Sequence, residues 1–126
     1  IANQITASID LYPTLANLAQ IELPENRIID GMDITGLILE KTTISPRNQF
    51  FYFDQGRGLK AIRQGDWKLF PGEKPQLYNL RKDIGEKNNV AAEFSELVDQ
   101  LTYEALQFEK EIEKKKREPG MVPVVQ

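Results

Sequence analysis

The chain has 126 residues and a net charge of −3, with 40% hydrophobic and 28% charged residues. This composition is typical of one compact globular domain and excludes disorder throughout the chain. The small net charge excludes a dedicated nucleic-acid binder, which needs a concentrated basic surface. Because there is no cysteine and no histidine, the chain cannot itself hold a disulfide, a Ser–His–Asp triad or an ordinary zinc site. No apolar run reaches the roughly 20 residues that span a bilayer.

The first part of the chain predicts short helices. Apolar residues recur at helical spacing over residues 8–21, where Ser8 or Asp10 is a candidate cap and Pro13 fits the first turn. Asp30-Gly31-Met32-Asp33 predicts a turn whose second carboxylate caps a short helix over residues 34–39. The polar segment 42–48 reads as a linker.

The next part predicts strands and then one long helix. Four strands separated by turn residues are expected at 50–53, 59–64, 67–70 and 76–80, with Gly65-Asp66 as a two-residue hairpin connection. From 92 to 117, apolar residues recur in steps of three and four, which predicts an amphipathic helix packed on the sheet. The fold class is therefore α+β: a four-stranded antiparallel sheet packed by a long C-terminal helix, preceded by a short helical segment.

Acidic residues in the turns are the first candidates for chemistry. Asp30 with Asp33, and Asp83 with Glu86, are the best carboxylate pairs, but helix and turn capping explains both better than catalysis. Asp83, Glu86 and Asn88 offer three oxygen ligands, but their spacing does not match a calcium-binding loop. We therefore predict neither a catalytic carboxylate nor a metal site in this chain.

A glycine-flanked loop is the other candidate. Gly56 and Gly58 surround Arg57, and Lys60 follows. Exposed backbone N–H groups beside an arginine fork could cradle an anion. A hairpin loop with solvated charges explains the same residues.

Two ordered sets of short motifs carry a family resemblance. The first consists of Asp10-Leu11-Tyr12-Pro13-Thr14-Leu15, then Leu18-Ala19, then Asp30-Gly31-Met32-Asp33. The second consists of Ala61-Ile62-Arg63, Gly65-Asp66-Trp67-Lys68-Leu69, Leu77-Tyr78-Asn79-Leu80, and then Asp83, Glu86 and Asn89. Their order and spacing resemble the C-terminal end of a sulfatase, of the arylsulfatase-like kind within the alkaline phosphatase superfamily.

The resemblance implies a division of the chain and a chemistry for the whole enzyme. Residues 1–45 would close the large catalytic domain, and residues 46–126 would form the small C-terminal subdomain. The implied reaction is sulfate ester hydrolysis by a formylglycine nucleophile, with Ca²⁺ as cofactor. That nucleophile is made in a Cys/Ser-x-Pro-x-Arg motif, and Ser45-Pro46-Arg47 lacks the spacer residue. We therefore expect a structural part without catalytic residue, metal ligand or cofactor of its own, in which Arg57 and Lys60 lie at the rim of the substrate pocket.

Two other functions stay open at this point. As alternatives, the chain would be the C-terminal part of a related phosphoryl-transfer hydrolase, or a non-enzymatic module whose long helix self-associates. The expected partner is the missing N-terminal catalytic domain, and a second copy of the chain could cover the apolar surface of residues 1–21 instead. Because the chain begins with Ile1 rather than methionine, we expect its natural start upstream. A secreted or periplasmic location of the whole enzyme is left open.

Overall fold

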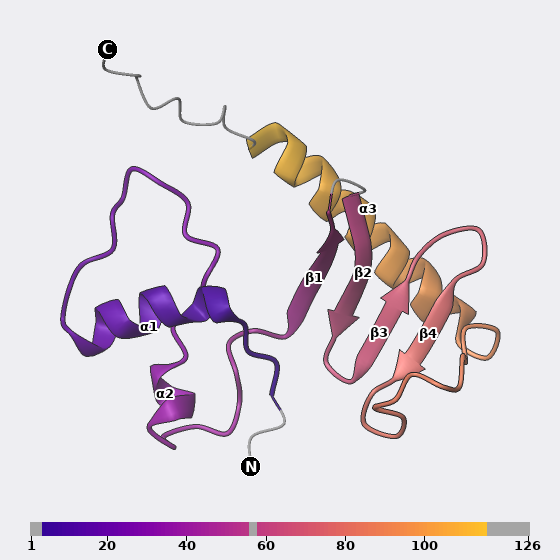
Figure 1. Ribbon diagram of the computed structural model, residues 1–126, viewed down its shortest axis with the longest axis horizontal. Helices are drawn as coiled ribbons and strands as arrows, with labels where there is room; N and C mark the ends of the chain where they lie inside the picture. The colour runs from indigo at the N-terminus through magenta and orange to yellow at the C-terminus, as the bar shows by residue number, and fades with distance from the viewer. Residues whose placement is uncertain (1–3, 56–57, 116–126) are drawn as a thin grey trace.

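The computed structural model describes residues 4–55 and 58–115 as two neighbouring groups of elements (Figure 1). The N-terminal segment, residues 4–47, contains the 3-10 helix η1 (Ser8–Asp10) and the helices α1 (Leu11–Leu18) and α2 (Thr35–Ile38). The sheet–helix unit, residues 49–115, contains β1 (Gln49–Asp54), β2 (Gly58–Gln64), β3 (Trp67–Phe70), β4 (Gln76–Asn79) and α3 (Ser95–Lys115). Within the described residues, no helix has the length and apolar character that crossing a membrane requires.

The predicted α+β architecture is confirmed. The four strands form one antiparallel sheet in the order β1-β2-β3-β4, and α3 lies along one face of it (Figure 1). The predicted strand and helix bounds differ from the observed ones by three residues at most. The predicted first helix divides into η1 and α1. Lys116 and Arg117, the predicted end of the last helix, fall outside the described residues.

Alternation along the strands decides which residues form the core. Ile62, Leu69 and Leu77 are neighbours in register on one face of the sheet, and all three are fully buried. The stripe of α3 covers this face with Val98, Leu101 and Ala105. At the other end of the helix, the ring of Phe108 stacks on Phe51 of β1 with the ring centroids 3.7 Å apart. The sheet–helix unit therefore has an ordinary apolar core, as the period of its sequence predicts.

The connection between β2 and β3 shows why its residues suit a tight hairpin. Gln64 pairs with Trp67, so the loop has only two residues, Gly65 and Asp66. The φ angle of Gly65 is 55°, a left-handed conformation that glycine adopts without steric cost. The predicted hairpin is confirmed.

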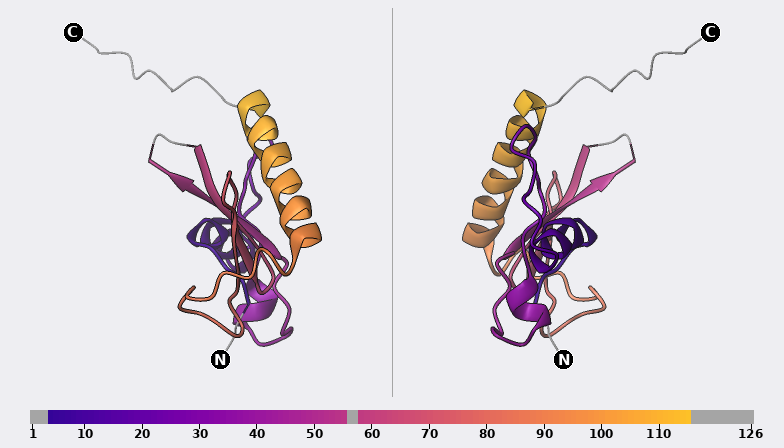
Figure 2. Two further views of the ribbon diagram at one scale, coloured as in Figure 1. Left: turned by 90° about the vertical axis from the view of Figure 1, so that its right-hand side faces the viewer. Right: turned by 90° about the vertical axis from the view of Figure 1, so that its left-hand side faces the viewer.

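The N-terminal segment lies beside the β1 edge of the sheet and contains little regular structure. Seen from the side, α3 covers one face of the sheet and α1 lies toward the other (Figure 2). Long loops join α1 to α2 and α2 to β1, and their backbone path is fixed by polar contacts rather than by an apolar core. Those contacts form the most unusual site in the molecule.

Candidate functional site

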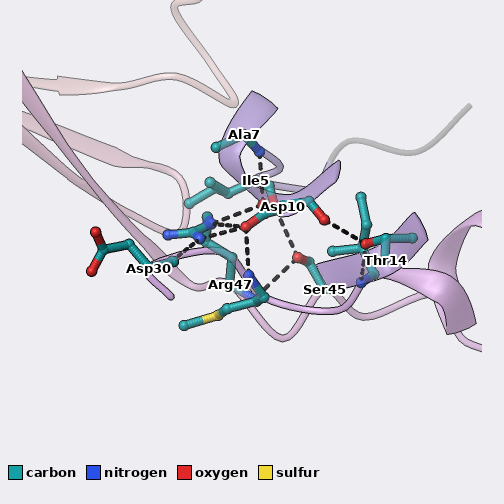
Figure 3. Close-up of polar contacts among 9 residues, drawn as sticks. Ile5, Ala7, Asp10, Thr14, Asp30, Ser45 and Arg47 are labelled. Atoms are coloured by element: carbon teal, nitrogen blue, oxygen red, sulfur yellow. Dashed lines mark hydrogen bonds and ion pairs between the residues drawn. The ribbon is translucent and has the colours of Figure 1, made fainter. Parts of the chain in front are cut away.

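A buried ion pair holds the N-terminal segment together. Asp10, at the end of η1, is fully buried, and Arg47, just before β1, is 8% exposed. The Arg47 guanidinium donates to both carboxylate oxygens of Asp10, with Nε 2.9 Å from Oδ2, and a second nitrogen donates to the carbonyl of Asp30 at 3.0 Å (Figure 3). The backbone N–H groups of Ala7 and Met32 also donate to the Asp10 carboxylate, both at 2.8 Å. One carboxylate thus links three stretches of chain that are far apart in sequence.

The charge state of this pair follows from its partners. Burial alone would raise the pKa of the Asp10 carboxyl, but hydrogen bonds from Arg47, Met32 and Ala7, together with the arginine charge, lower that pKa below its ordinary value. Asp10 is therefore ionised at neutral pH. Fully hydrogen-bonded charges of this kind are costly to separate, because removing one partner leaves the other buried and uncompensated.

Two hydroxyl groups extend the network. Thr14 Oγ1 donates to the Asp10 carbonyl at 2.5 Å and accepts the N–H of Ile34 at 3.0 Å. Ser45 Oγ donates to the Ile5 carbonyl at 2.7 Å and accepts the N–H of Arg47 at 3.1 Å (Figure 3). Segment 42–48 was predicted as a linker and has no helix or strand, but its Ser45 and Arg47 are buried.

Gly31 lets the loop after α1 pass against η1. A Cβ atom at this position would lie 2.1 Å from the carbonyl oxygen of Ile9 and 2.9 Å from the ring of Pro13. Only a residue without a side chain fits, so the N–H of the next residue, Met32, can reach Asp10. The carboxylate of Asp33 accepts the N–H of Thr35, the first residue of α2, at 2.8 Å. The N-cap position of α2 is Ile34 rather than the predicted Asp33, so Asp33 contacts the helix start from one residue further out.

Helix α1 buries Pro13, Thr14 and Ala16 and leaves its leucines exposed. Asp10, Thr14 and Asn17, in steps of four and three, contact the rest of the segment. Leu11, Leu15 and Leu18 each follow one of these residues directly, roughly 100° further round the helix. They are 51%, 61% and 46% exposed. A surface helix in water normally turns such a stripe of leucines toward the core. This apolar face, together with Tyr12 and Ile21, therefore has the character of a surface that another part of a protein covers.

The carboxylates of Asp83 and Glu86 make loop and ion-pair contacts. Asp83 accepts the N–H groups of Lys87 and Asn88 at 2.8 and 2.7 Å and so fixes the loop after β4. Glu86 pairs with Lys68 at 2.6 Å. The ammonium of Lys68 also lies 4.9 Å from the ring centroid of Tyr52 and 4.8 Å from that of Phe70. Among residues 4–55 and 58–115, no group of three His, Cys, Asp or Glu side chains could hold a metal ion.

The glycine-flanked hairpin is described on one side only. Gly56 and Arg57 fall outside the described residues, whereas Lys60 is exposed on β2. Tyr52 pairs with Ala61 and Phe53 with Leu59, so Lys60 is the extra residue of a β-bulge. The N–H of Leu59 donates to the carboxylate of Glu109 on α3 at 3.0 Å, which anchors the base of the hairpin to the helix. The structure therefore presents Lys60 to solvent beside a fixed loop base.

The residues that sequence reasoning missed are the inward polar ones. Asp10 was considered as a cap and as part of a family motif, and Arg47 only within a failed motif match. A signal was present, since Asp10, Thr14 and Asn17 form a polar stripe at helical spacing beside the stripe of leucines. Nothing local indicated that Arg47, 37 residues away from Asp10, would be its partner.

Comparisons with known proteins show which proteins share this sequence and architecture. No family model matches the chain. Arylsulfatase A of Bos taurus is 33% identical over 90% of this chain and 27% of its own length. A solved Bacteroides thetaiotaomicron structure, described under the metabolism of multiple glycosaminoglycans, matches 80% of this chain and 24% of its own with a TM-score of 0.68 and 28% identity. The chain is homologous to the C-terminal region of sulfatases. The PsFucS1 sulfatase from Pseudoalteromonas sp. shares the fold over 87% of this chain and 26% of its own, with a TM-score of 0.73 and 22% identity.

These matches cover only part of each relative. The chain spans about a quarter of the length of the relatives it matches. The predicted resemblance to the C-terminal region of sulfatases and the predicted fold are confirmed. The region shared with the bovine arylsulfatase A includes both the N-terminal segment and the sheet–helix unit, because it covers nine tenths of the chain.

Proposed function

We propose that this chain is the C-terminal part of a sulfatase, and that the formylglycine nucleophile and the Ca²⁺ site lie in an upstream catalytic part. The whole enzyme would hydrolyse sulfate esters, with the nucleophile attacking sulfur and the cation stabilising the growing oxyanion charge. The present chain would have a structural role and be inactive alone. Homology to sulfatases over a quarter of their length supports this proposal.

The single observation that carries the structural role is the outward apolar face of α1. Leu11, Leu15 and Leu18 are exposed, while the polar side of the same helix is satisfied by the N-terminal segment. Burying such a face against the upstream part would be strongly favourable, because apolar area leaves water. In this proposal residues 1–45 complete the catalytic domain and residues 46–126 form the small subdomain.

We further propose that Arg57 and Lys60 stand at the rim of the substrate pocket. Support comes from the exposure of Lys60, from its place at a β-bulge and from the anchoring of the hairpin base by Glu109. Bulges re-aim side chains and are common beside active sites. In the intact enzyme, Lys60→Ala and Arg57→Ala are expected to raise KM for a sulfated substrate. Lys74→Ala, in the loop between β3 and β4, is the matched control, and unchanged kinetics in all three variants would contradict the rim assignment.

The test of the proposed function uses the reading frame that contains this chain. The intact polypeptide and the 126-residue chain are assayed side by side with an aryl sulfate and the matching aryl phosphate. We expect the intact polypeptide to hydrolyse the sulfate ester and the chain alone to hydrolyse neither. A preference for the phosphate would indicate the related phosphoryl-transfer hydrolase. Activity of the chain alone, or a frame without a catalytic part, would contradict the proposal.

A further inference from the structure

The first residues of β2 depart from the alternation of a regular strand. Ile62 lies on the face of the sheet that α3 covers, so strict alternation would place Lys60 on that face as well. The bulge prevents this, because Phe53 pairs with Leu59 and Lys60 is left as the extra residue. Leu59 packs against the core in its place, and Lys60 is exposed. The bulge therefore decides that a leucine, rather than a lysine, meets the helix.

A carboxylate on α3 contacts the backbone at this bulge. The N–H of Leu59 donates to Glu109 Oε1 at 3.0 Å. Gly58 passes the same oxygen so closely that an added Cβ atom would lie 3.3 Å from it. One oxygen of α3 thus meets two consecutive residues at the start of β2, directly before Lys60.

The turn of α3 that carries Glu109 is itself fixed on the sheet. The ring of Phe108 stacks on Phe51, and its centroid lies 6.2 Å from that of Phe53, so it holds α3 against β1. Because Phe108 contacts β1 and Glu109 contacts β2, two neighbouring residues of the helix hold both strands of the hairpin. A shift of β2 by one residue, roughly 3.3 Å, would break the hydrogen bond to Glu109.

This hydrogen bond supplies a direction that apolar burial does not. Burial of Leu59 favours the bulge, but apolar contacts are non-directional and do not fix the peptide group beside Lys60. A hydrogen bond to a carboxylate is directional and about twice as strong as one between neutral groups. The N–H of Leu59 is one residue away from Lys60, so fixing this N–H fixes the direction in which the lysine side chain leaves the sheet.

We infer that Glu109 is a positioning residue for the proposed sulfate ester hydrolysis: it holds the backbone of Leu59 and thereby directs Lys60 toward the substrate. This role rests on the proposed place of Lys60 at the pocket rim. The negative charge of a carboxylate repels a sulfate ester, so removal of the charge alone would lower the KM. Loss of the positioning would raise it, and the two effects therefore have opposite signs.

The first test compares two substitutions in the intact polypeptide, with an aryl sulfate as substrate. Glu109→Ala removes the acceptor and is expected to raise the KM about threefold with kcat unchanged, because a surface cation contributes equally to ground and transition states. Glu109→Gln keeps an acceptor oxygen and should leave the KM at or below the wild-type value. Gln107→Ala, at an exposed position of the same helix, is the control and should change neither constant. A KM that stays the same or falls in Glu109→Ala would overturn the inference.

A double-mutant cycle shows whether Glu109 acts through Lys60. In the Lys60→Ala background, Glu109→Ala should raise the KM no further, because the side chain that it positions is gone. An equal rise in both backgrounds would overturn the inference. If Lys60→Ala raises the KM and Glu109→Ala does not, the inference is overturned and the rim assignment stands. If neither raises it while the aryl sulfate is hydrolysed, the rim assignment and the inference both fail, and the rest of the proposed function stands.

A second measurement does not depend on activity. Amide hydrogen exchange of Leu59 in the intact polypeptide should be about tenfold faster in Glu109→Ala, because a hydrogen bond to a charged group is lost. Glu109→Gln should lie close to the wild type, and Gln107→Ala should equal it. Unchanged exchange of Leu59 in Glu109→Ala would show that the carboxylate does not hold the bulge, and would overturn the inference whatever the substrate.

Discussion

The sheet–helix unit and the N-terminal segment are stabilised by opposite means. In the first, Ile62, Leu69 and Leu101 are fully buried in an apolar core between sheet and helix. In the second, the buried centre is the ion pair of Asp10 with Arg47, and the leucines of α1 are exposed. The sheet–helix unit therefore buries its own apolar side chains. The N-terminal segment is held by an internal hydrogen-bond network around Asp10 and Arg47, and its apolar side chains remain exposed for contact with another part of the protein.

The largest loss of stability should come from breaking the ion pair of Asp10 with Arg47. Arg47→Met leaves the buried Asp10 carboxylate without its counter-charge and is expected to cost about 4 kcal/mol in the free energy of unfolding of the N-terminal segment. Amide hydrogen exchange over residues 7–34 measures this loss directly. Arg81→Met, at an arginine whose side chain is 81% exposed, is the matched control and should change little. Equal exchange in both variants would show that the ion pair does not hold the segment.

A change in the apolar core sharpens the comparison from the other side. Leu101→Ala removes a fully buried side chain from α3 and should lower the free energy of unfolding by about 3 kcal/mol, through lost burial and a residual cavity. Urea denaturation followed by circular dichroism gives the value. Leu106→Ala on the same helix, where the side chain is half exposed, should cost much less. Similar losses in the two variants would mean that α3 does not cover the sheet as described.

A single methyl group tests the path of the loop around the ion pair. Gly31→Ala puts a Cβ atom against the Ile9 carbonyl, so the loop must shift, at a cost of about 2 kcal/mol. We expect faster exchange of the Met32 amide, which donates to Asp10. At Gly85 the nearest atoms to an added Cβ belong to side chains at 3.4 Å or more, so Gly85→Ala serves as the control. An unchanged Met32 amide in Gly31→Ala would refute the close approach.

The smallest expected effect is a pH dependence. The folded-state pKa of Asp10 is lower than its ordinary value of 3.8, so the unfolded chain binds the proton more readily than the folded one. The stabilisation is therefore fully present above pH 3.8 and is lost as the pH falls through the lowered folded-state pKa. Urea midpoints measured downward from pH 6 should show this loss in the wild type and a weaker one in Asp10→Asn. Parallel curves would contradict an ionised Asp10 in the folded segment.

The sequence predicted the sheet–helix unit better than the N-terminal segment. The strands and α3 have clear periods, and the residues on the buried side of each period, such as Leu77 and Leu101, are those of the core. In the N-terminal segment the period of α1 was read correctly, but the partners of its polar side were not. Asp10 meets Arg47 and Met32 only after two long loops have folded back, and no local pattern encodes such contacts. Lys60 was a candidate from its neighbours alone, and its bulge depends on the register with β1.

The proposed structural role depends most on the apolar face of α1 being covered in the whole protein. Hydroxyl-radical labelling of Tyr12, Leu15 and Leu18, compared between the chain alone and the intact polypeptide, measures the exposure of these side chains directly. We predict strong labelling in the chain alone, where they are about half exposed, and a severalfold decrease in the intact polypeptide. Equal labelling of these three side chains in both proteins would contradict the account.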